Sequence, residues 1–346
     1  MHFEHFIITI FCFRGKKAFE HLYWPGFNFY INPFNPKFLE FRLTLFKMFC
    51  LPGILSQTNQ NFTWIILIDK ELNPEIKDAL KNLVLKKQRS HILEYEESYK
   101  LEQTDWLVPY FTKKPDYVLT SNHDDDDILP PGFVDGIQKH IKETNQISKL
   151  PPIKLLGAKQ IIQWDLIHSK KSYYGWSSPW HRGYFPSSCG FSLLSKYPET
   201  NMSVLGLAHR RAEEYFDPEI RPENQHNKYH RNRIAHSFAK CGDNLQDWEK
   251  VDLFFDVSEL SGPVLMSNHS RNAQHARLYE KKPDDKKVSG PESFPDFMLD
   301  WNEINKNIKR FGKNRQLYII RELQRIYRKL KRHTKRYLTN LRNLTI

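Results

Sequence analysis

Four consecutive aspartates, Asp124–Asp127, are the residues of this chain best suited to chemistry. They follow a strand-like apolar run, Tyr117–Thr120, and precede a Pro-Pro-Gly turn. Carboxylates held a few ångströms apart repel one another and raise each other's pKa. A divalent cation that bridges to a phosphate removes this repulsion, and Mg²⁺ or Mn²⁺ prefers such oxygen ligands. The position of the cluster therefore predicts a metal site, and a solvated acidic loop is the alternative.

The elements that must position these aspartates alternate between strand and helix. Apolar runs predict strands over Phe6–Phe13, Phe62–Asp69, Ile92–Glu96 and Tyr117–Thr120. Helical spacing predicts helices over Phe38–Leu55, ending near Pro52-Gly53, over Glu75–Lys86 with Asn73 as N-cap, and over Asp105–Phe111. Continuous apolar strands separated by helices indicate an α/β fold with a parallel sheet covered on both faces. Ligands of such sheets bind beyond the carboxyl ends of the strands, where Asp69 and the four aspartates fall.

Length and composition indicate a globular protein. The 346 residues are 40% hydrophobic and 14% aromatic, and no apolar run approaches the ~20 uncharged residues of a membrane span. The opening apolar run lacks a basic leader and a small-residue cleavage site, so we interpret it as a first strand. The four cysteines are far apart in the sequence, form no CxxC pair, and are expected to be buried free thiols of a cytoplasmic protein: Cys12, Cys50, Cys189 and Cys241.

Two common nucleotide-binding loops are absent from the sequence. The chain has no GxGxxG, and Gly15-Lys16-Lys17 lacks the upstream glycine and the Ser/Thr of a P-loop. These absences argue against a dinucleotide dehydrogenase and against a P-loop NTPase. A nucleotide would instead be held through its base, its ribose and a metal-bridged diphosphate, which is the chemistry of sugar-nucleotide enzymes.

Four segments of the chain form a recognisable pattern: Phe34–Arg42, Phe49–Pro52, Gln57–Asp69 and the aspartates with Ile128-Leu-Pro130. This pattern resembles the rhamnosyltransferase family of bacterial glycosyltransferases, and the resemblance covers roughly residues 3 to 275. It implies a GT-A-like fold, a nucleoside-diphosphate sugar donor and a divalent cation, Mn²⁺ or Mg²⁺. The chain departs from the pattern at Ser121-Asn-His123, where a more typical member has an Arg and an apolar residue.

The resemblance also implies roles for the aspartates, because the DxD motif of the fold maps to Asp124-Asp125-Asp126. Asp126 would be the metal ligand that bridges to the donor diphosphate. Asp124 would accept a hydrogen bond from the ribose or reach the metal through water. Asp125 would lie beside them at the donor, and Asp127 would support the loop.

Other candidates are more scattered along the chain. Arg14, just after the first strand, is a candidate to pair with the diphosphate, and Asp69 to contact the base or ribose; a surface arginine is the alternative for Arg14. Glu213 and Glu214 follow the aspartates at the separation where inverting GT-A enzymes place their catalytic base, Glu213 being slightly favoured. His269 is the candidate for a further metal ligand.

The second half is expected to supply the acceptor side. Its aromatic-dense stretch, Tyr173–Phe191, could line an acceptor cleft or belong to the core, and Ser187–Phe191 has the composition of a loop beside such a cleft. His226 and His230 have helical spacing, but a solvated polar segment is favoured over a zinc site.

The predicted domain division of the chain is a glycosyltransferase domain over 1–275, with a donor half 1–135 and an acceptor half 136–275. A linker over 276–305 and a basic helical tail over 306–346 follow.

The tail carries the charge of the chain. From residue 305 onward there are 14 Lys or Arg and one acid, about +13, against +12 for the whole chain. Apolar residues recur at helical spacing, which predicts a basic amphipathic helix: Ile319, Leu323, Ile326, Leu330, Tyr337, Leu341 and Leu344. Such a helix could bind the anionic inner face of the cytoplasmic membrane, near glycan or lipid-linked acceptors, or pack on the catalytic domain.

Two other functions are alternatives to a glycosyltransferase. One is a nucleic-acid-binding protein that uses the basic tail, which the near-neutral charge of the rest of the chain disfavours. The other is a metal-dependent phosphohydrolase that uses the same aspartates.

Overall fold

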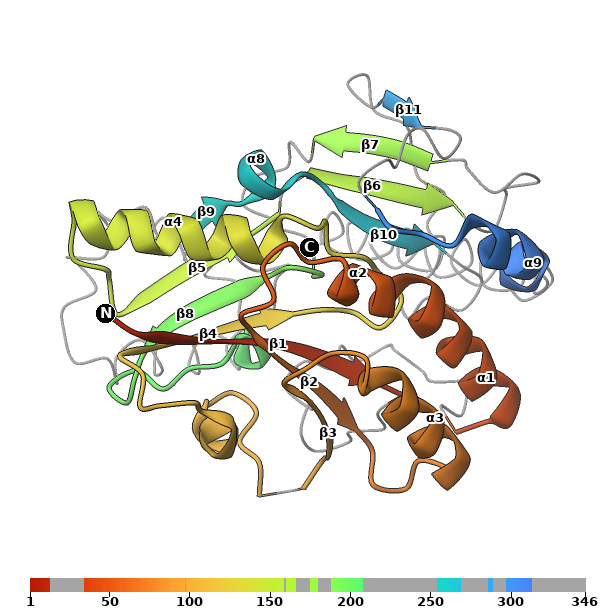
Figure 1. The fold of residues 1–346 in the computed structure, drawn as a ribbon, viewed down its shortest axis with the longest axis horizontal. Coiled ribbons are helices and arrows are strands. Elements are labelled where there is room, and N and C mark those ends of the chain that lie inside the picture. Colours follow the sequence, from red (N-terminus) through yellow and green to blue (C-terminus); the bar gives the residue numbers. More distant parts are fainter. Residues whose placement is uncertain are drawn as a thin grey trace, which may run out of the picture.

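Two β-sheets organise the part of the chain that the computed structural model describes, which is residues 1–12, 34–96, 98–158, 160–165, 175–179, 188–207, 254–268, 286–288 and 297–312. The main sheet has the order β3-β2-β1-β4-β8-β5-β9, and a smaller sheet has the order β10-β6-β7-β11 (Figure 1). The main-sheet strands are β1 (Phe3–Phe11), β2 (Thr63–Ile68), β3 (Ser90–Glu94), β4 (Tyr117–Asn122), β5 (Ile153–Gly157), β8 (Ser192–Lys196) and β9 (Phe254–Asp256). The smaller sheet contains β6 (Gln160–Asp165), β7 (Gly175–Pro179), β10 (Val264–Asn268) and β11 (Lys286–Val288).

The main sheet is mostly parallel, as predicted. Strand β8 runs antiparallel to its neighbours β4 and β5, and every other neighbouring pair is parallel. The carboxyl ends of β1, β2 and β4 therefore lie at one edge of the sheet, together with the beginning of β8. The α/β class with a mostly parallel central sheet, expected for a GT-A-like fold, is confirmed.

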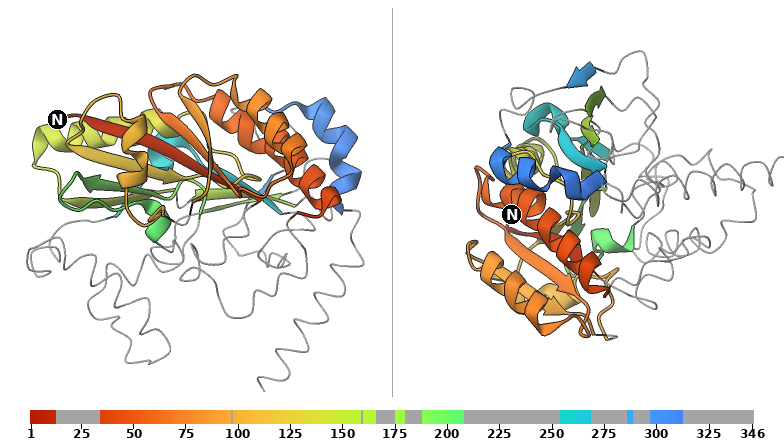
Figure 2. Two further views of the ribbon diagram at one scale, coloured as in Figure 1. Left: turned by 90° about the horizontal axis from the view of Figure 1, so that it is seen from below. Right: turned by 90° about the vertical axis from the view of Figure 1, so that its right-hand side faces the viewer.

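Both faces of the main sheet are buried, because successive residues of each strand point to opposite sides. Ile7 and Phe11 face a core formed with α1 (Pro36–Leu45), α2 (Leu51–Leu55), α3 (Pro74–Val84) and α4 (Phe133–Ile147). Figures 1 and 2 show these helices on one side of the sheet. Phe6 and Ile8 face the opposite core, which contains the 3₁₀ helices Asp105–Tyr110 and Val204–Gly206. The predicted strands and helices of the first 122 residues are thus present, with ends shifted by a few residues.

The helix predicted over Phe38–Leu55, with an end near Pro52-Gly53, is present and extends two residues past Gly53 to Leu55. A π-helical segment, Phe46–Cys50, joins α1 to α2, and Pro52 falls in the first turn of α2. A proline is tolerated there because the first helical turn does not need its N–H group. The extension brings Gly53 against the residues that follow the aspartates.

The helical segment 36–55 is buried between the two sheets. Phe46 stacks on Trp64 of β2 with ring centroids 5.7 Å apart, while Phe49 meets Trp164 of β6 at 5.4 Å. Phe49 and Trp164 belong to a third core, between the helical segment and the smaller sheet. Helix α9 (Trp301–Gly312) completes this third core through Trp301, whose ring lies 5.6 Å from that of Trp164. A helix that is apolar around most of its circumference is expected to be enclosed in this way.

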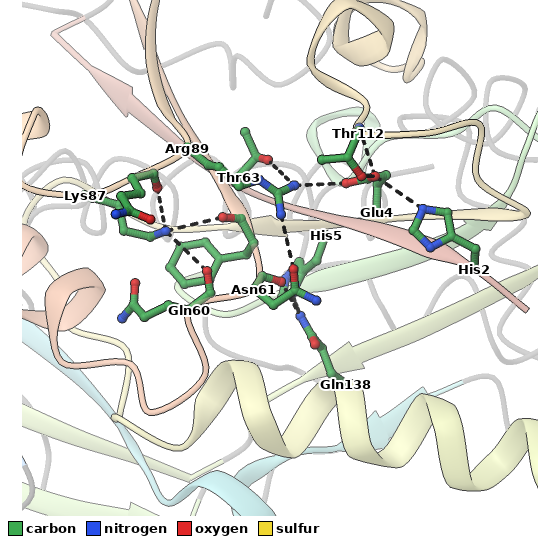
Figure 3. Close-up of polar contacts among 12 residues, drawn as sticks. His2, Glu4, His5, Gln60, Asn61, Thr63, Lys87, Arg89, Thr112 and Gln138 are labelled. Carbon is green, nitrogen blue, oxygen red and sulfur yellow. Dashed lines mark hydrogen bonds and ion pairs between the residues drawn. The ribbon is translucent and has the colours of Figure 1, made fainter.

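The opposite, amino-terminal end of the main sheet has its own polar network (Figure 3). Glu4 of β1 is 3% exposed and accepts hydrogen bonds from Arg89 Nη2 at 3.0 Å and from the Thr112 backbone N–H at 3.0 Å. Gln138 of α4 donates to the Asn61 carbonyl at 2.8 Å. Gln138 Nε2 also lies 3.2 Å from His5 Nδ1 of β1, so Gln138 joins α4 both to the loop before β2 and to the sheet, at the end opposite the aspartates.

Within these ranges no helix is both long and apolar enough to cross a membrane. Helix α9 begins at Trp301, inside the segment predicted to be a linker. The division into domains stays a prediction.

Candidate functional site

The four aspartates form a loop at the carboxyl edge of the main sheet, just after β4, in which Asp124 is half-buried and the other three are buried. The exposed fractions of Asp125, Asp126 and Asp127 are 3%, 8% and 4%. A solvated acidic loop, the alternative interpretation of the sequence, is therefore wrong. Buried carboxylates need partners, since an isolated charge in a protein interior is costly.

Arg42 of α1 is the cationic partner of this loop. Its Nε donates to Asp125 Oδ2 at 3.1 Å, its Nη2 contacts Asp125 Oδ1, and its Nη1 donates to Asp126 Oδ2 at 2.8 Å. The side chain is 13% exposed. Burial is the largest influence on the pKa of Arg42 and by itself would lower it, but the charges of its neighbours, Asp126 foremost, and the hydrogen bond to Asp126 together raise the pKa. The guanidinium therefore stays charged and bridges two of the four carboxylates.

Asp124 has two hydrogen-bond partners, Asn122 at the end of β4 and Ser188 in the segment that precedes β8. Ser188 Oγ donates to Asp124 Oδ2 at 2.5 Å, and Asn122 Nδ2 donates to Asp124 Oδ1 at 3.1 Å. Gly190, with φ of +80°, makes the turn that brings Ser188 there. Burial and the charge of Asp126 raise the pKa of Asp124 above its ordinary value. The loop expected beside an acceptor cleft, Ser187–Phe191, thus contributes at least Ser188 to the aspartates.

Asp127 is bound to the smaller sheet. Its Oδ1 accepts the Ser267 backbone N–H at 2.8 Å, and Ser267 Oγ donates to the Asp126 carbonyl at 2.6 Å. Beside it, Ile128 and Leu265 exchange backbone hydrogen bonds of 2.9 and 3.0 Å. Burial, together with the charges of Asp126 and Asp124, raises the pKa of Asp127 well above its ordinary value. The predicted supporting role of Asp127 agrees with these contacts, which join the two sheets at the loop.

Neutral groups line the underside of the loop. His123 Nε2 lies 3.1 Å from the Asp127 carbonyl, and burial lowers the pKa of His123 to about 4, so the imidazole is neutral and donates through Nε2. Cys50 Sγ is 3.7 Å from His123 Nδ1. Burial raises the pKa of the Cys12 thiol to about 12 and those of Cys50 and Cys189 well above the ordinary value. The prediction of buried free thiols is confirmed for these three cysteines, and Cys241 lies outside the described ranges.

The charges of the site do not balance. Among the residues that the structure describes, the four carboxylates meet one guanidinium, that of Arg42. Burial and the charges of neighbouring aspartates raise the pKa values of Asp124 and Asp127. No group of three His, Cys, Asp or Glu side chains converges as a complete metal cage in the described ranges. Mg²⁺ and similar ions, however, commonly use one or two carboxylates and take their other ligands from water and substrate phosphates. The donor set therefore fits a hard cation held jointly with a phosphate, with Asp126 and Asp124 as its protein ligands.

Asp69 lies at the same edge but not at the aspartates. It follows β2, and since β1 lies between β2 and β4, roughly 10 Å of sheet separates the two sites. Its Oδ1 accepts the Glu71 backbone N–H at 2.9 Å, which forms a turn after the strand.

Several predicted residues lie outside the described ranges, and their roles stay predictions: Arg14, Glu213, Glu214, His269, His226, His230, and the tail beyond Gly312. Two of them have described neighbours at the site. Cys12, two residues before Arg14, lies near Arg42 and Asp126, and the charges of these two residues influence the pKa of the Cys12 thiol. Ser267, two residues before His269, contacts the aspartate loop directly.

Sequence reasoning missed Arg42, Ser188 and Ser267 as members of the site. For Arg42 a signal existed, because it is a charged residue in a helix that is otherwise apolar on several faces. Ser188 and Ser267 carry no comparable signal, since an isolated serine in a loop or at a strand end is ordinary. Only the pairing of β8 with β4, and the bridge between Ile128 and Leu265, brings these serines to the aspartates.

Comparisons with known proteins bear on this site. Residues 31–155, about a third of the chain, match the model of a family described as "Putative rhamnosyl transferase". The matched segment contains Arg42, Asp69 and all four aspartates. No curated protein matches the chain.

Solved structures show only distant likeness. The apo-form glycosyltransferase GlyE of Streptococcus pneumoniae TIGR4 is 10% identical with a TM-score of 0.31, over 90% of this chain and 64% of that one. S. aureus TarS 1-349 in complex with UDP-GlcNAc is 12% identical with a TM-score of 0.26, over 49% of this chain and 37% of that one. This chain thus spans less than two thirds of either protein, and likeness at these scores carries no argument. The family match over residues 31–155 confirms the resemblance seen in the sequence.

Proposed function

We propose that the protein moves a sugar from a nucleoside-diphosphate sugar to a glycan or lipid-linked envelope acceptor, with Mn²⁺ or Mg²⁺ bound at Asp126. Rhamnose is the sugar that the family description suggests. The observation that carries the proposal is the buried aspartate loop. It presents an excess of carboxylates at the carboxyl edge of a parallel sheet, inside the segment that matches the family.

The residues of the loop have separate tasks in this proposal. Asp126 and Asp124 hold the cation, which when bound supplies Lewis-acid stabilisation of the leaving diphosphate. Asp127, tied to Ser267 at 2.8 Å, keeps the loop in place between the two sheets. Asp69, at the end of β2, contacts the base or ribose of the donor. Glu213 or Glu214 removes the proton from the acceptor hydroxyl.

The first experiment is a thermal-shift titration with Mn²⁺ and a panel of UDP, GDP, ADP and dTDP. We expect one or more of these diphosphates to raise the melting temperature only when Mn²⁺ is present. The Asp126→Ala variant should lose this stabilisation, because the cation loses its main protein ligand. The donor sugar is then identified by screening nucleotide sugars for Mn²⁺-dependent hydrolysis.

The matched control is Asp78→Ala, on the exposed surface of α3, where the carboxylate is 71% exposed and has only a weak contact with Lys81. It should respond to Mn²⁺ and diphosphates as the wild type does. Stabilisation by an oligonucleotide without any response to diphosphates would instead favour a nucleic-acid-binding protein. Metal-dependent release of phosphate from simple phosphoesters, without transfer of sugar, would favour a phosphohydrolase.

A further inference from the structure

Arg42 makes unequal contacts with its two carboxylate partners. It holds Asp125 through two nitrogens, Nε and Nη2, which form a fork on both carboxylate oxygens. It reaches Asp126 through Nη1 alone, at 2.8 Å from Oδ2. Paired contacts of an arginine with one carboxylate are stronger and more directional than a single contact. Asp125 is therefore the anchor of Arg42, and Asp126 is the partner that can be given up.

The single contact lies on the carboxylate that is proposed to hold the cation. A divalent cation and a guanidinium cannot both take the same carboxylate oxygen at bonding distance, so a cation that used Asp126 Oδ2 would require Nη1 to withdraw. The fork on Asp125 would keep the rest of the guanidinium within a few ångströms. Nη1, buried and charged, then needs another acceptor. A phosphate bound to the cation would lie next to it, and phosphate oxygens are the acceptors that arginine matches best.

We propose that Arg42 is a positioning residue that occupies Asp126 in the free enzyme, yields it to the cation, and transfers its Nη1 hydrogen bond to the donor diphosphate. This inference rests on the proposed function. Before the cation arrives, Arg42 reduces the repulsion between Asp125 and Asp126 and holds both side chains in place. Once the cation is bound, Asp125 acts only through Arg42, which explains why a third carboxylate lies between two that serve the donor.

The test measures two affinities for each variant: that of Mn²⁺ alone, and that of the diphosphate from the panel that binds the wild type, at saturating Mn²⁺. Both are measured by calorimetry, and free Mn²⁺ is also followed by its electron paramagnetic resonance signal. In Arg42→Gln, Mn²⁺ alone should bind about tenfold more tightly, because a charged hydrogen bond no longer competes for Asp126. The diphosphate should bind about tenfold more weakly, because Nη1 is missing.

Arg42→Lys separates competition from simple electrostatics. Lysine keeps the positive charge but cannot form the fork on Asp125 while donating to Asp126. We therefore expect Mn²⁺ alone to bind roughly threefold more tightly than to the wild type, with weaker diphosphate binding. Because this variant retains the buried charge, it also keeps the test decisive if Arg42→Gln does not fold.

Arg89→Gln is the matched control, since Arg89 also pairs with a buried acid, Glu4, at the opposite end of the sheet (Figure 3). It should lower the melting temperature and leave both affinities unchanged. Arg42 variants that bind Mn²⁺ no more tightly than the wild type would overturn the inference, while the proposed function stands. A wild type that binds neither Mn²⁺ nor any diphosphate in its presence would refute the proposed function itself.

Discussion

Gly53 lets the helical segment 36–55 approach the aspartate loop, and its replacement by alanine should disturb both. A Cβ atom at this position would lie 2.9 Å from Ile128 Cγ2 and 3.1 Å from the Leu129 backbone N, whereas ordinary contacts begin near 3.4 Å. The helix and the loop would have to separate by about half an ångström. Since Ile128 directly follows Asp127, that shift is transmitted to the carboxylates.

The cost can be worked from two opposing contributions. Overpacking of a well-packed interior costs about 1–3 kcal/mol, while alanine is favoured over glycine within a helix by ~1 kcal/mol. We expect Gly53→Ala to lower the free energy of unfolding by ~1 kcal/mol, or about 2 °C in melting temperature. The affinity for a diphosphate in the presence of Mn²⁺ should fall several-fold, because the spacing of Arg42 and Asp126 changes.

Gly136→Ala in α4 is the matched control. Its added Cβ would meet Leu260 Cβ at 3.1 Å, but Leu260, in the short helix α8 (Ser258–Ser261), is 46% exposed and can move. This variant should be as stable as the wild type or slightly more stable, with unchanged ligand affinity. Chemical denaturation gives the stabilities and calorimetry gives the affinities. A Gly53→Ala protein that matches Gly136→Ala in both measurements would refute the packing argument.

Two further predictions concern the remote network and the tail. Burial would raise the pKa of Glu4, but hydrogen bonds from Thr112 and the charge of Arg89 lower this pKa below its ordinary value of 4.5. Glu4 therefore stabilises the fold above that pH, and the stability is lost as the pH falls through the folded-state pKa. Glu4→Gln should therefore flatten the acid limb of a melting-temperature profile between pH 5 and 3, and an unchanged limb would show that other groups control it. The basic tail is expected to bind anionic membranes, so the full chain should sediment with vesicles rich in anionic lipid, whereas a chain ending at Gly312 should remain in solution. Equal sedimentation of the two chains would contradict a membrane role for the tail.

The sequence determined the elements and the edge at which they act. The apolar runs of β1, β2 and β4, with the Asn73 cap of α3, follow from local preferences that hold in any context. The aspartates had to lie at the carboxyl edge, because a parallel sheet places the ends of its strands together. The end of the helix was placed near Pro52-Gly53, because proline and glycine ordinarily end helices. It lies two residues later, at Leu55, because Pro52 falls in the first turn of α2, after the π-helical segment.

Tertiary structure alone decided what the aspartates contact. Arg42 is 83 residues from Asp125, Ser188 is 64 from Asp124, and Ser267 is 140 from Asp127. Such contacts depend on how two sheets and a helix pack, and spacing along the chain contains no record of that packing. The sequence could therefore indicate four neighbouring carboxylates whose mutual repulsion must be offset by positive charge. Only the fold could bring the guanidinium of Arg42 to Asp125 and Asp126, because the separation of charges is a property of three-dimensional distance.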